Sequence, residues 1–387
     1  MPEPQVTIAA RGLRRIEAGH PWIYKSDILA VSASAGDIVR VLSERGRFVG
    51  RAFYSDRSQI ALRFLTRDDL PVDRDFLLDR IRKAAERRHT WVTNSEVFRV
   101  VYSEGDLLPS LIVDRYGDVL VIQTLSQATE KLKSQFVDIL VELFSPAAVI
   151  ERNDPRSRLQ EGLSQTVSTL HGNTPSTVVA QMNGLRFGFD LLHGQKTGAF
   201  LDQRENYQAA RKYAFGDALD CFTYNGAFAL TIASQCQSVQ AIDFSPDAIE
   251  GARRNQELNQ IANVSFRVEN AFDALRQFAD RGRTFDTVIL DPPAFAKNKA
   301  SLAAALRGYK EINLRSLKLL RPGGYLVTAS CSHHLAEPEF LGLIAQAGLD
   351  AGKQLVVVER RTQSADHPIL LTVPETSYLK LFILRAI

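Results

Sequence analysis

The sequence predicts an α/β protein in which a doubly wound, mostly parallel sheet follows a small β-barrel and a small central α/β domain. Three observations support this class. Residues 6–65 form short apolar runs separated by turn residues, residues 97–150 hold strand runs around one helix, and strand and helix signals alternate from residue 218 onward. Such alternation is typical of βαβ units and parallel sheets. The expected domains are 1–67, 68–177 and 178–387.

The composition of the chain is that of a globular protein without membrane spans, disulfide bonds or a metal site. The chain of 387 residues is 45% hydrophobic and 24% charged, which is ordinary for globular domains. No apolar run approaches the roughly 18 residues of a membrane span, so we expect a cytoplasmic protein with no membrane partner. Its three cysteines, Cys221, Cys236 and Cys331, provide neither a disulfide framework nor paired metal-ligand spacing, and we expect reduced thiols and no metal.

The amino-terminal segment combines barrel signals with a positive charge. Its alternating runs are Val6–Ala9, Asp37–Leu42, Arg47–Phe53 and Ile60–Leu65. Residues 1–67 hold eleven Lys or Arg against six Asp or Glu, a net charge of +5, whereas the rest of the chain holds 36 against 38. A basic module on a near-neutral body indicates a polyanionic partner, most simply nucleic acid. An arginine-rich solvated surface is the alternative.

The central domain is expected after a linker at Thr66–Pro71. Apolar residues at helical spacing predict an amphipathic helix over Phe76–Thr90, and a second helix is expected over Thr129–Phe144. The expected strands are Phe98–Tyr102, Ser110–Asp114, Val119–Thr124 and Ala147–Glu151. The polar run His171–Thr177 marks the end of this domain.

Polar residues end successive strands of the third domain. The expected strands are Ala218–Phe222, Val239–Asp243, Val264–Val268, Thr287–Leu290 and Gly324–Ser330. Asp220, Asp243, Asn270 and Asp291 stand at or just after the ends of the first four, where open α/β sheets bind ligands. The turn at Gly226 lacks the G-x-G-x-x-G pattern of dinucleotide sites, so the set favours S-adenosylmethionine. Asp243 and Asn270 are equally compatible with helix caps.

A polar segment lies just upstream, and we expect it to be a flexible loop. It contains Asp202, Gln203 and Arg204, which are candidate cofactor contacts. Phe200 and Tyr224 are candidate faces for the cationic sulfonium, through cation–π attraction of about 0.5 to 2 kcal/mol. Phe200 is equally compatible with a role as a core anchor.

Two motifs carry the chemistry: Asp291-Pro-Pro-Ala-Phe295 and the strand end at Cys331. Carbon 5 of cytosine is a poor nucleophile, so its methylation requires a thiolate at carbon 6 and an acid at nitrogen 3. Cys331 and Asp291 provide these groups. The Asp-Pro-Pro-x-Phe loop alone fits amino-group methylation, which needs no thiol. A lone cysteine is otherwise most often a buried small hydrophobe, but Cys331 stands at a strand end.

Taken together, these motifs resemble ribosomal RNA 5-methylcytosine methyltransferases with an amino-terminal PUA domain. The resemblance covers nearly the whole chain and rests on Gly194–Arg204, Cys221–Gly226, Asp291–Phe295, Arg307–Lys310, Ser330–Ser332 and Ala365–Pro368. It implies a PUA domain at about 1–67, a Rossmann-like methyltransferase domain that binds S-adenosylmethionine, and large-subunit (23S) ribosomal RNA as substrate. Several members look like homodimers. The sequence departs from the family at Asn270, where a carboxylate is commoner, and at Asn225.

The resemblance also implies residue roles, with Cys331 as the nucleophile and Asp291 as the acid that contacts the base. The candidate cofactor residues are Phe200, Asp202, Gln203, Arg204, Asp220, Phe222, Tyr224, Gly226, Asp243, Asn270 and Asp291. The candidate substrate residues are Pro292, Pro293, Phe295, Lys297, Arg307 and Tyr309. The charged residues of Ala365–Pro368 could reach the substrate, although His367 also fits a turn.

Several alternatives remain at the level of sequence. Positive charge near Cys331 would favour its thiolate, and His333, His334 and Lys297 are candidates. The base that removes the carbon 5 proton is unassigned. Other functions are an RNA amino-group methyltransferase, a noncatalytic RNA-binding or ribosome-assembly factor, and a small-molecule methyltransferase, which the basic amino-terminal module disfavours.

Overall fold

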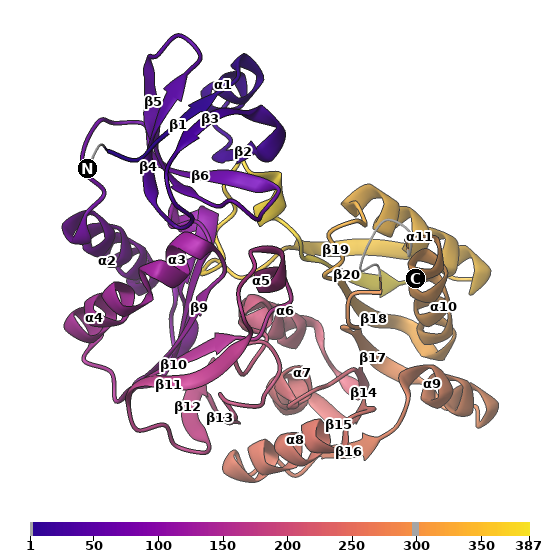
Figure 1. Cartoon of the computed structure of the whole chain (residues 1–387). Coiled ribbons are helices and arrows are strands. Elements are labelled where there is room, and N and C mark those ends of the chain that lie inside the picture. Colours follow the sequence, from indigo (N-terminus) through magenta and orange to yellow (C-terminus); the bar gives the residue numbers. More distant parts are fainter. Residues whose placement is uncertain (1–2, 296–301) are drawn as a thin grey trace. The chain divides into compact units, whose positions relative to one another are not determined.

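The computed structural model describes residues 3–295 and 302–387, and its chain divides into two compact units (Figure 1). The first unit contains Met1–Gln181, Phe189–Leu201 and Ala365–Thr376, and the second contains Met182–Gly188, Asp202–Ser364 and Ser377–Ile387. Three segments of the expected contiguous third domain, residues 178–181, 189–201 and 365–376, therefore fall in the first unit. None of the described helices is long and apolar enough to span a bilayer.

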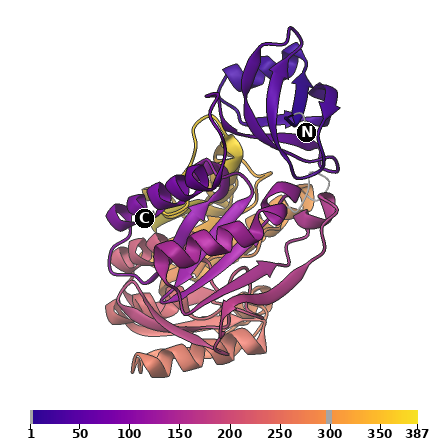
Figure 2. The ribbon, with the colours of Figure 1, turned by 60° about the vertical axis from the view of Figure 1, so that its left-hand side comes forward.

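A six-stranded sheet in the order β2-β6-β5-β4-β1-β3 forms the amino-terminal part of the first unit. Figure 2 shows its indigo strands as a curled sheet. The strands are β1 (Gln5–Ile8), β2 (Trp22–Tyr24), β3 (Ile28–Ser32), β4 (Ile38–Ser43), β5 (Phe48–Tyr54) and β6 (Ile60–Thr66), with helix α1 (Ala10–Glu17) between β1 and β2. Alternation in β4 buries Val39 and Val41 beside Val6 and Ile8 of β1.

The second sheet of this unit has five strands in the order β11-β10-β9-β8-β7. They are β7 (Val97–Tyr102), β8 (Leu111–Tyr116), β9 (Val119–Thr124), β10 (Ala148–Asn153) and β11 (Thr166–Gly172). The helices are α2 (Arg74–Trp91), α3 (Gln127–Lys131), α4 (Lys133–Phe144) and α5 (Ser157–Gln160). Asp73 caps α2 by accepting from the amide of Phe76, and Leu77 and Ile81 of α2 join Phe136 of α4 in one core. The strands and helices expected for the central segment are present, and its division as a separate domain stays a prediction.

A short two-stranded sheet, β12 (Val178–Met182) with β13 (Leu185–Phe189), precedes the large sheet of the second unit. The large sheet has seven strands in the order β16-β15-β14-β17-β18-β20-β19. They are β14 (Gly216–Cys221), β15 (Cys236–Asp243), β16 (Val264–Val268), β17 (Phe285–Leu290), β18 (Leu320–Ser330), β19 (Leu355–Arg361) and β20 (Lys380–Ala386). The first five run parallel, whereas β20 is antiparallel to both β18 and β19.

The helices of this unit alternate with its parallel strands, as the doubly wound prediction requires (Figure 1). They are α6 (Arg204–Tyr213), α7 (Ala227–Ile232), α8 (Pro246–Leu258), α9 (Ala271–Asp280), α10 (Leu302–Leu319) and α11 (Glu337–Asp350). Strand order reverses at β14, because β15 and β16 extend the sheet on one side and β17 and β18 on the other. Ligands of open α/β sheets bind at such a switch point.

Candidate functional site at the strand ends

Three carboxylates converge at the switch point of the second unit. Asp220 lies on β14 opposite Ile289 of β17, one residue before the pair Cys221 and Leu290, so Asp291 follows directly on the neighbouring strand. Asp243 ends the strand on the other side. Burial, and to a lesser extent the charges of Asp291 and Asp243, raise the pKa of Asp220 to about 7, against hydrogen bonds from Thr223 and the amide of Ala229 that lower it.

Only one of the two carboxylate oxygens of Asp220 accepts hydrogen bonds from described residues. Its Oδ2 accepts from Thr223 Oγ1 (2.6 Å) and from the amide of Ala229 (3.1 Å). Its Oδ1 is buried and has no hydrogen-bond partner within the described part of the chain. An orphaned buried carboxylate oxygen is costly unless a ligand donates to it. The site therefore fits a cofactor that carries positive charge and N–H or O–H donors, as S-adenosylmethionine does.

The turn after β14 has unusual backbone geometry. Phe222 (φ 66), Tyr224 (φ 50) and Gly226 (φ 85) all adopt left-handed conformations. The amide of Tyr224 donates to Asp243 Oδ2 (2.9 Å), while Asp243 Oδ1 accepts from the amide of Ser245 (3.0 Å). Asp243 thus ties this turn to the end of β15. The helix-cap interpretation of Asp243 is wrong, because Ser245 caps α8 by accepting from the amide of Ala248. Non-glycine residues in such conformations cluster at ligand sites.

Asn270 follows β16 and caps α9. Its Oδ1 accepts from the amides of Phe272 (2.9 Å) and Asp273 (3.4 Å), and the residue is exposed. The cap interpretation of Asn270 is confirmed. A cofactor contact through its amide group stays a prediction.

Asp291 is positioned by a directed chain of hydrogen bonds. Gln203 Nε2 donates to Asp291 Oδ1 (2.9 Å), and Gln203 Oε1 accepts from Asn206 Nδ2 (2.6 Å). Asn206 Oδ1 accepts in turn from Arg361 Nε (2.7 Å). Because a guanidinium can only donate, Arg361 fixes the orientation of both amides and points the donor of Gln203 at Asp291. Gln203 was expected to contact the cofactor, whereas no sequence pattern indicates Asn206 or Arg361.

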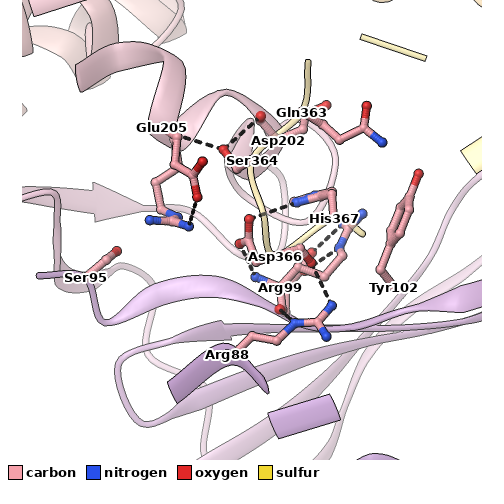
Figure 3. A network of polar contacts seen from close by, with 12 residues as sticks. Arg88, Ser95, Arg99, Tyr102, Asp202, Glu205, Gln363, Ser364, Asp366 and His367 are labelled. Carbon is pink, nitrogen blue, oxygen red and sulfur yellow. Dashed lines mark hydrogen bonds and ion pairs between the residues drawn. The ribbon is translucent and has the colours of Figure 1, made fainter. Parts of the chain in front are cut away.

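The segment around Gln203 differs from the flexible loop that the sequence predicted. Asp202, Gln203 and Arg204 are each 2% exposed. Asp202 Oδ2 accepts from the Tyr378 hydroxyl (2.6 Å), and Arg204 pairs with Glu205 (3.2 Å). Figure 3 shows the amide of Glu205 donating to Ser364 Oγ (2.9 Å), and the amide of Ser364 donates to the Asp202 carbonyl (2.8 Å). These contacts build a buried polar support behind Asp291.

Phe200 belongs to the first unit, and its ring already has a cationic neighbour. The Lys196 ammonium lies 4.4 Å from the ring centroid. A contact between Phe200 and a sulfonium stays a prediction.

Cys331 differs from the other two cysteines by its surroundings. Cys221 and Cys236 are buried, and burial raises the pKa of Cys236 to about 12 and that of Cys221 well above its usual range. Cys331 follows β18 and is partly exposed. The adjacent Ser330 and Ser332 both hydrogen-bond the Tyr309 hydroxyl (2.9 and 3.0 Å). Cys331 therefore lies at a strand end and is partly exposed, as the sequence predicted, and its role as a nucleophile stays a prediction.

Lys380 is a further residue of the site, and it contacts the backbone after Cys331. It begins β20, and its Nζ donates to the carbonyls of Ser332 (2.7 Å) and Leu335 (2.8 Å), which follow Cys331. The sequence gives no signal for this contact, because it depends on antiparallel pairing of β20 with β18. The earlier candidates His333 and His334 are exposed, and Lys297 lies outside the described residues.

The candidate substrate residues differ in how exposed their side chains are. Pro293 and Arg307 are exposed, Phe295 is partly buried and Pro292 is buried. The ring of Phe295 packs against Tyr309, with centroids 4.7 Å apart. Tyr309 itself is fully buried, which does not fit the expected stacking on RNA and assigns it to the support of the Cys331 turn instead.

The segment Ala365–Pro368 is used within the first unit. Arg88 Nη2 donates to the carbonyl of Asp366 (2.7 Å), and the amide of Arg99 donates to Asp366 Oδ2 (2.9 Å). Arg88 also makes a bidentate contact with Asp106 (2.6 Å for both bonds), and His367 lies beside Tyr102 (Figure 3). The charged side chains of this segment, which the sequence suggested for the substrate, form a buried structural network.

Comparisons with known proteins agree with this geometry. Residues 6–67 match a model of PUA-like domains, and residues 155–384 match a model of S-adenosylmethionine-dependent methyltransferases. The protein named ribosomal RNA large subunit methyltransferase I from Shewanella frigidimarina is 39% identical over 383 residues, 96% of each chain. The protein of the same name from Tolumonas auensis is 38% identical over 379 residues, 95% of this chain and 96% of the other.

Solved structures share the fold at lower identity. The methyltransferase SMU.776, solved with SAH, has a TM-score of 0.85 at 18% identity and covers 98% of this chain and 99% of its own. A SAM-dependent methyltransferase from Streptococcus mutans has a TM-score of 0.82 at 16% identity, with the same coverage. The family model spans more than half of the chain, and the curated relatives span nearly all of it. The chain therefore belongs to the S-adenosylmethionine-dependent methyltransferases, in the family of ribosomal RNA large subunit methyltransferase I.

Proposed function

We propose that the protein methylates carbon 5 of a cytosine in 23S ribosomal RNA, with S-adenosylmethionine as methyl donor and Cys331 as a transient covalent nucleophile. The observation that carries the proposal is the placement of partly exposed Cys331 and Asp291 after the adjacent parallel strands β18 and β17. The names of the relatives support ribosomal RNA as substrate. The +5 charge of residues 1–67 supports a polyanionic partner.

The cofactor is expected beside the switch point, held by the turn after β14 and by Asp220 and Asp243. When bound, S-adenosylmethionine supplies an electrophilic methyl group. The unpaired Oδ1 of Asp220 is available to accept a hydrogen bond from a cationic donor. Asp243 follows the second strand, where carboxylates of this fold class bind ribose hydroxyls.

The proposed chemistry uses the two strand-end groups in sequence. The thiolate of Cys331 forms a bond to carbon 6 of the cytosine while protonated Asp291 donates to nitrogen 3. The displaced electron pair makes carbon 5 nucleophilic, and carbon 5 takes the methyl group. Loss of the carbon 5 proton to a base then restores the double bond and expels Cys331 as a thiolate, and nitrogen 3 returns its proton to Asp291. Gln203 holds one oxygen of Asp291 in a fixed direction.

Transfer of radiolabelled methyl groups to deproteinised 23S ribosomal RNA that lacks its own modification tests the proposal. We expect label in 5-methylcytidine with the wild type and with the control Cys236→Ala. That substitution removes a buried thiol that has no part in the proposed reaction. Cys331→Ala should lose activity by about 1,000-fold or more, because no other group can form the carbon 6 bond. RNA containing 5-fluorocytidine should trap the wild type covalently, since fluorine at carbon 5 cannot leave as a proton.

Three results would redirect the assignment. Full transfer by Cys331→Ala, or label on an exocyclic amine, would mean that the Asp291 loop acts without the thiol as an amino-group methyltransferase. Failure to bind S-adenosylmethionine in calorimetry, with RNA binding retained, would favour a noncatalytic assembly factor. RNA affinity that does not depend on salt would favour a small-molecule substrate.

A further inference from the structure

Lys380 places a buried ammonium group beneath the turn that carries Cys331. Its backbone pairs with Ser330, the last residue of β18, and its side chain is only 9% exposed. The Nζ donates to the carbonyls of Ser332 (2.7 Å) and Leu335 (2.8 Å). Two of its three donors therefore hold the backbone that follows Cys331.

The charge of Lys380 is not balanced by a carboxylate. Within residues 3–295 and 302–387, no Asp or Glu lies within ion-pair distance of its Nζ, and burial lowers its pKa. The negative charges that act on it in the opposite direction are those of Cys331 and then Glu337. Glu337 is exposed at the start of α11, where water screens it. A buried ammonium is costly without a counter-charge, and the Cys331 thiolate is the group placed to supply one.

The other titratable groups around this turn do not replace Lys380. His333 and His334 are exposed, and the His333 ring stacks on Tyr378 with centroids 5.3 Å apart. Burial raises the pKa of Tyr309, and the charge of Cys331 raises it further, so its hydroxyl stays neutral. Tyr309 is thus a hydrogen-bonding neighbour and not a source of positive charge.

We propose that Lys380 is a positioning residue that anchors the Cys331 turn and stabilises the thiolate form of Cys331 as its buried counter-charge. This inference rests on the proposed role of Cys331. It assigns the positive charge near the nucleophile to a residue on the antiparallel strand β20, in place of the neighbouring histidines or Lys297.

The thiol titration of Cys331 tests the inference without RNA or cofactor. The rate of alkylation by iodoacetamide is measured against pH, and the Cys331 peptide is quantified by mass spectrometry, so the buried Cys221 and Cys236 do not interfere. In the wild type we expect an apparent pKa below the ordinary value of about 8.5. Lys380→Met should raise it by about one unit or more, which means about tenfold less thiolate at neutral pH. Lys380→Arg should restore most of the shift.

Lys353→Met is the matched control. Lys353 also donates to a backbone carbonyl, that of Leu320 (2.6 Å), but at the opposite end of β18. Its loss should leave the titration of Cys331 unchanged. Two results would overturn the inference: a wild-type pKa at or above the ordinary value, or an unchanged profile in a Lys380→Met protein that still binds S-adenosylmethionine. A wild-type pKa at or above the ordinary value overturns the inference even if Lys380→Met fails to fold, and Lys380→Arg then provides the second variant for a lowered value.

The outcome is separable from that of the proposed function. If Cys331→Ala remains active in methyl transfer while the thiol titration depends on Lys380, then the nucleophile assignment fails and the electrostatic pairing stands. If Cys331→Ala is inactive and the titration of Cys331 does not depend on Lys380, then the nucleophile assignment stands and the electrostatic pairing fails.

Discussion

Asp220 is the residue whose ionisation is most strongly set by the fold. It is fully buried, faces Asp291 and Asp243, and keeps one oxygen without a partner among the described residues. Its pKa of about 7 means that the cofactor-free protein carries a protonated Asp220 across much of the acidic range. A cationic ligand would favour the ionised form, so cofactor binding and proton release should be coupled.

The pH dependence of S-adenosylmethionine binding tests this coupling. The folded pKa is raised from 3.8 to about 7, so unfolding of the free protein becomes easier as pH rises through that window, and the stabilising contribution is complete only below it. Cofactor affinity should show the opposite trend, falling by up to about tenfold per pH unit below pH 7. Calorimetry in two buffers of different ionisation enthalpy should detect release of a proton at pH 6.

Asp220→Asn is expected to remove both the pH dependence and the released proton. Asp247→Asn, an exposed position in the first turn of α8, should keep both. Affinity that stays constant from pH 5.5 to 8, or uptake of a proton, would contradict the coupling.

Residues with a local signature could be predicted from the sequence, and residues that act through pairing of distant strands could not. Asp220, Asp243, Asp291 and Cys331 each end a recognisable apolar strand. Lys380 acquires its role only because β20 runs antiparallel to β18 and pairs with Ser330. Asn206 and Arg361 likewise meet through a hydrogen bond between segments far apart in the chain. Neither contact leaves a periodic pattern.

Among the elements, the turn between β14 and α7 is the most constrained. Gly226 has a φ of 85°, and a Cβ there would lie 3.0 Å from Phe266 Cζ and 3.2 Å from Ala252 Cβ. The glycine is required both by its backbone conformation and by the close approach of α8 and β16. The same turn presents Tyr224 to Asp243, so its geometry connects packing to the cofactor site.

Gly226→Ala is expected to destabilise the protein by about 1–3 kcal/mol, since left-handed backbone and crowding both disfavour a side chain. It should also weaken S-adenosylmethionine binding. Gly251→Ala is the control within α8, where the nearest atom to a new Cβ is Arg254 Nη2 at 3.9 Å. That substitution should stabilise the protein by about 0.5–1 kcal/mol. Urea unfolding and calorimetry measure both effects, and a neutral Gly226→Ala would show that the turn can relax.

Strong periodicity also decides which elements the sequence could predict. The parallel strands β14 to β18 were expected because buried apolar runs alternate with helical patterns. The short strands β2 and β3, the edge strands β11 and β19, and β20 were not expected. β3 and β19 are largely exposed, so they lack the buried face that produces an alternating signal. The three-domain division stays a prediction, since the two compact units divide the chain differently.

At the scale of the whole molecule, charge and chemistry lie in different parts of the chain. Residues 1–67 carry +5 and the rest −2, whereas Asp220, Asp243, Asp291 and Cys331 belong to the second unit. Arg14 and Arg45 of the first segment are exposed and form no ion pair with any residue that the structure describes. Such arginines are available for phosphate contacts, which provide affinity without sequence information.

The double variant Arg14→Glu/Arg45→Glu should therefore weaken RNA binding and leave methyl transfer at saturating RNA nearly unchanged. Each lost phosphate contact lowers the slope of log affinity against log salt by about 0.7–0.9, so the slope should fall by about 1.5. Arg281→Glu/Arg283→Glu makes the same change in net charge at exposed positions of the second unit and should affect the slope less. Filter binding of ribosomal RNA at several salt concentrations measures both variants. An equal loss in the two would mean that RNA responds to the net charge of the chain and not to the basic PUA-like segment.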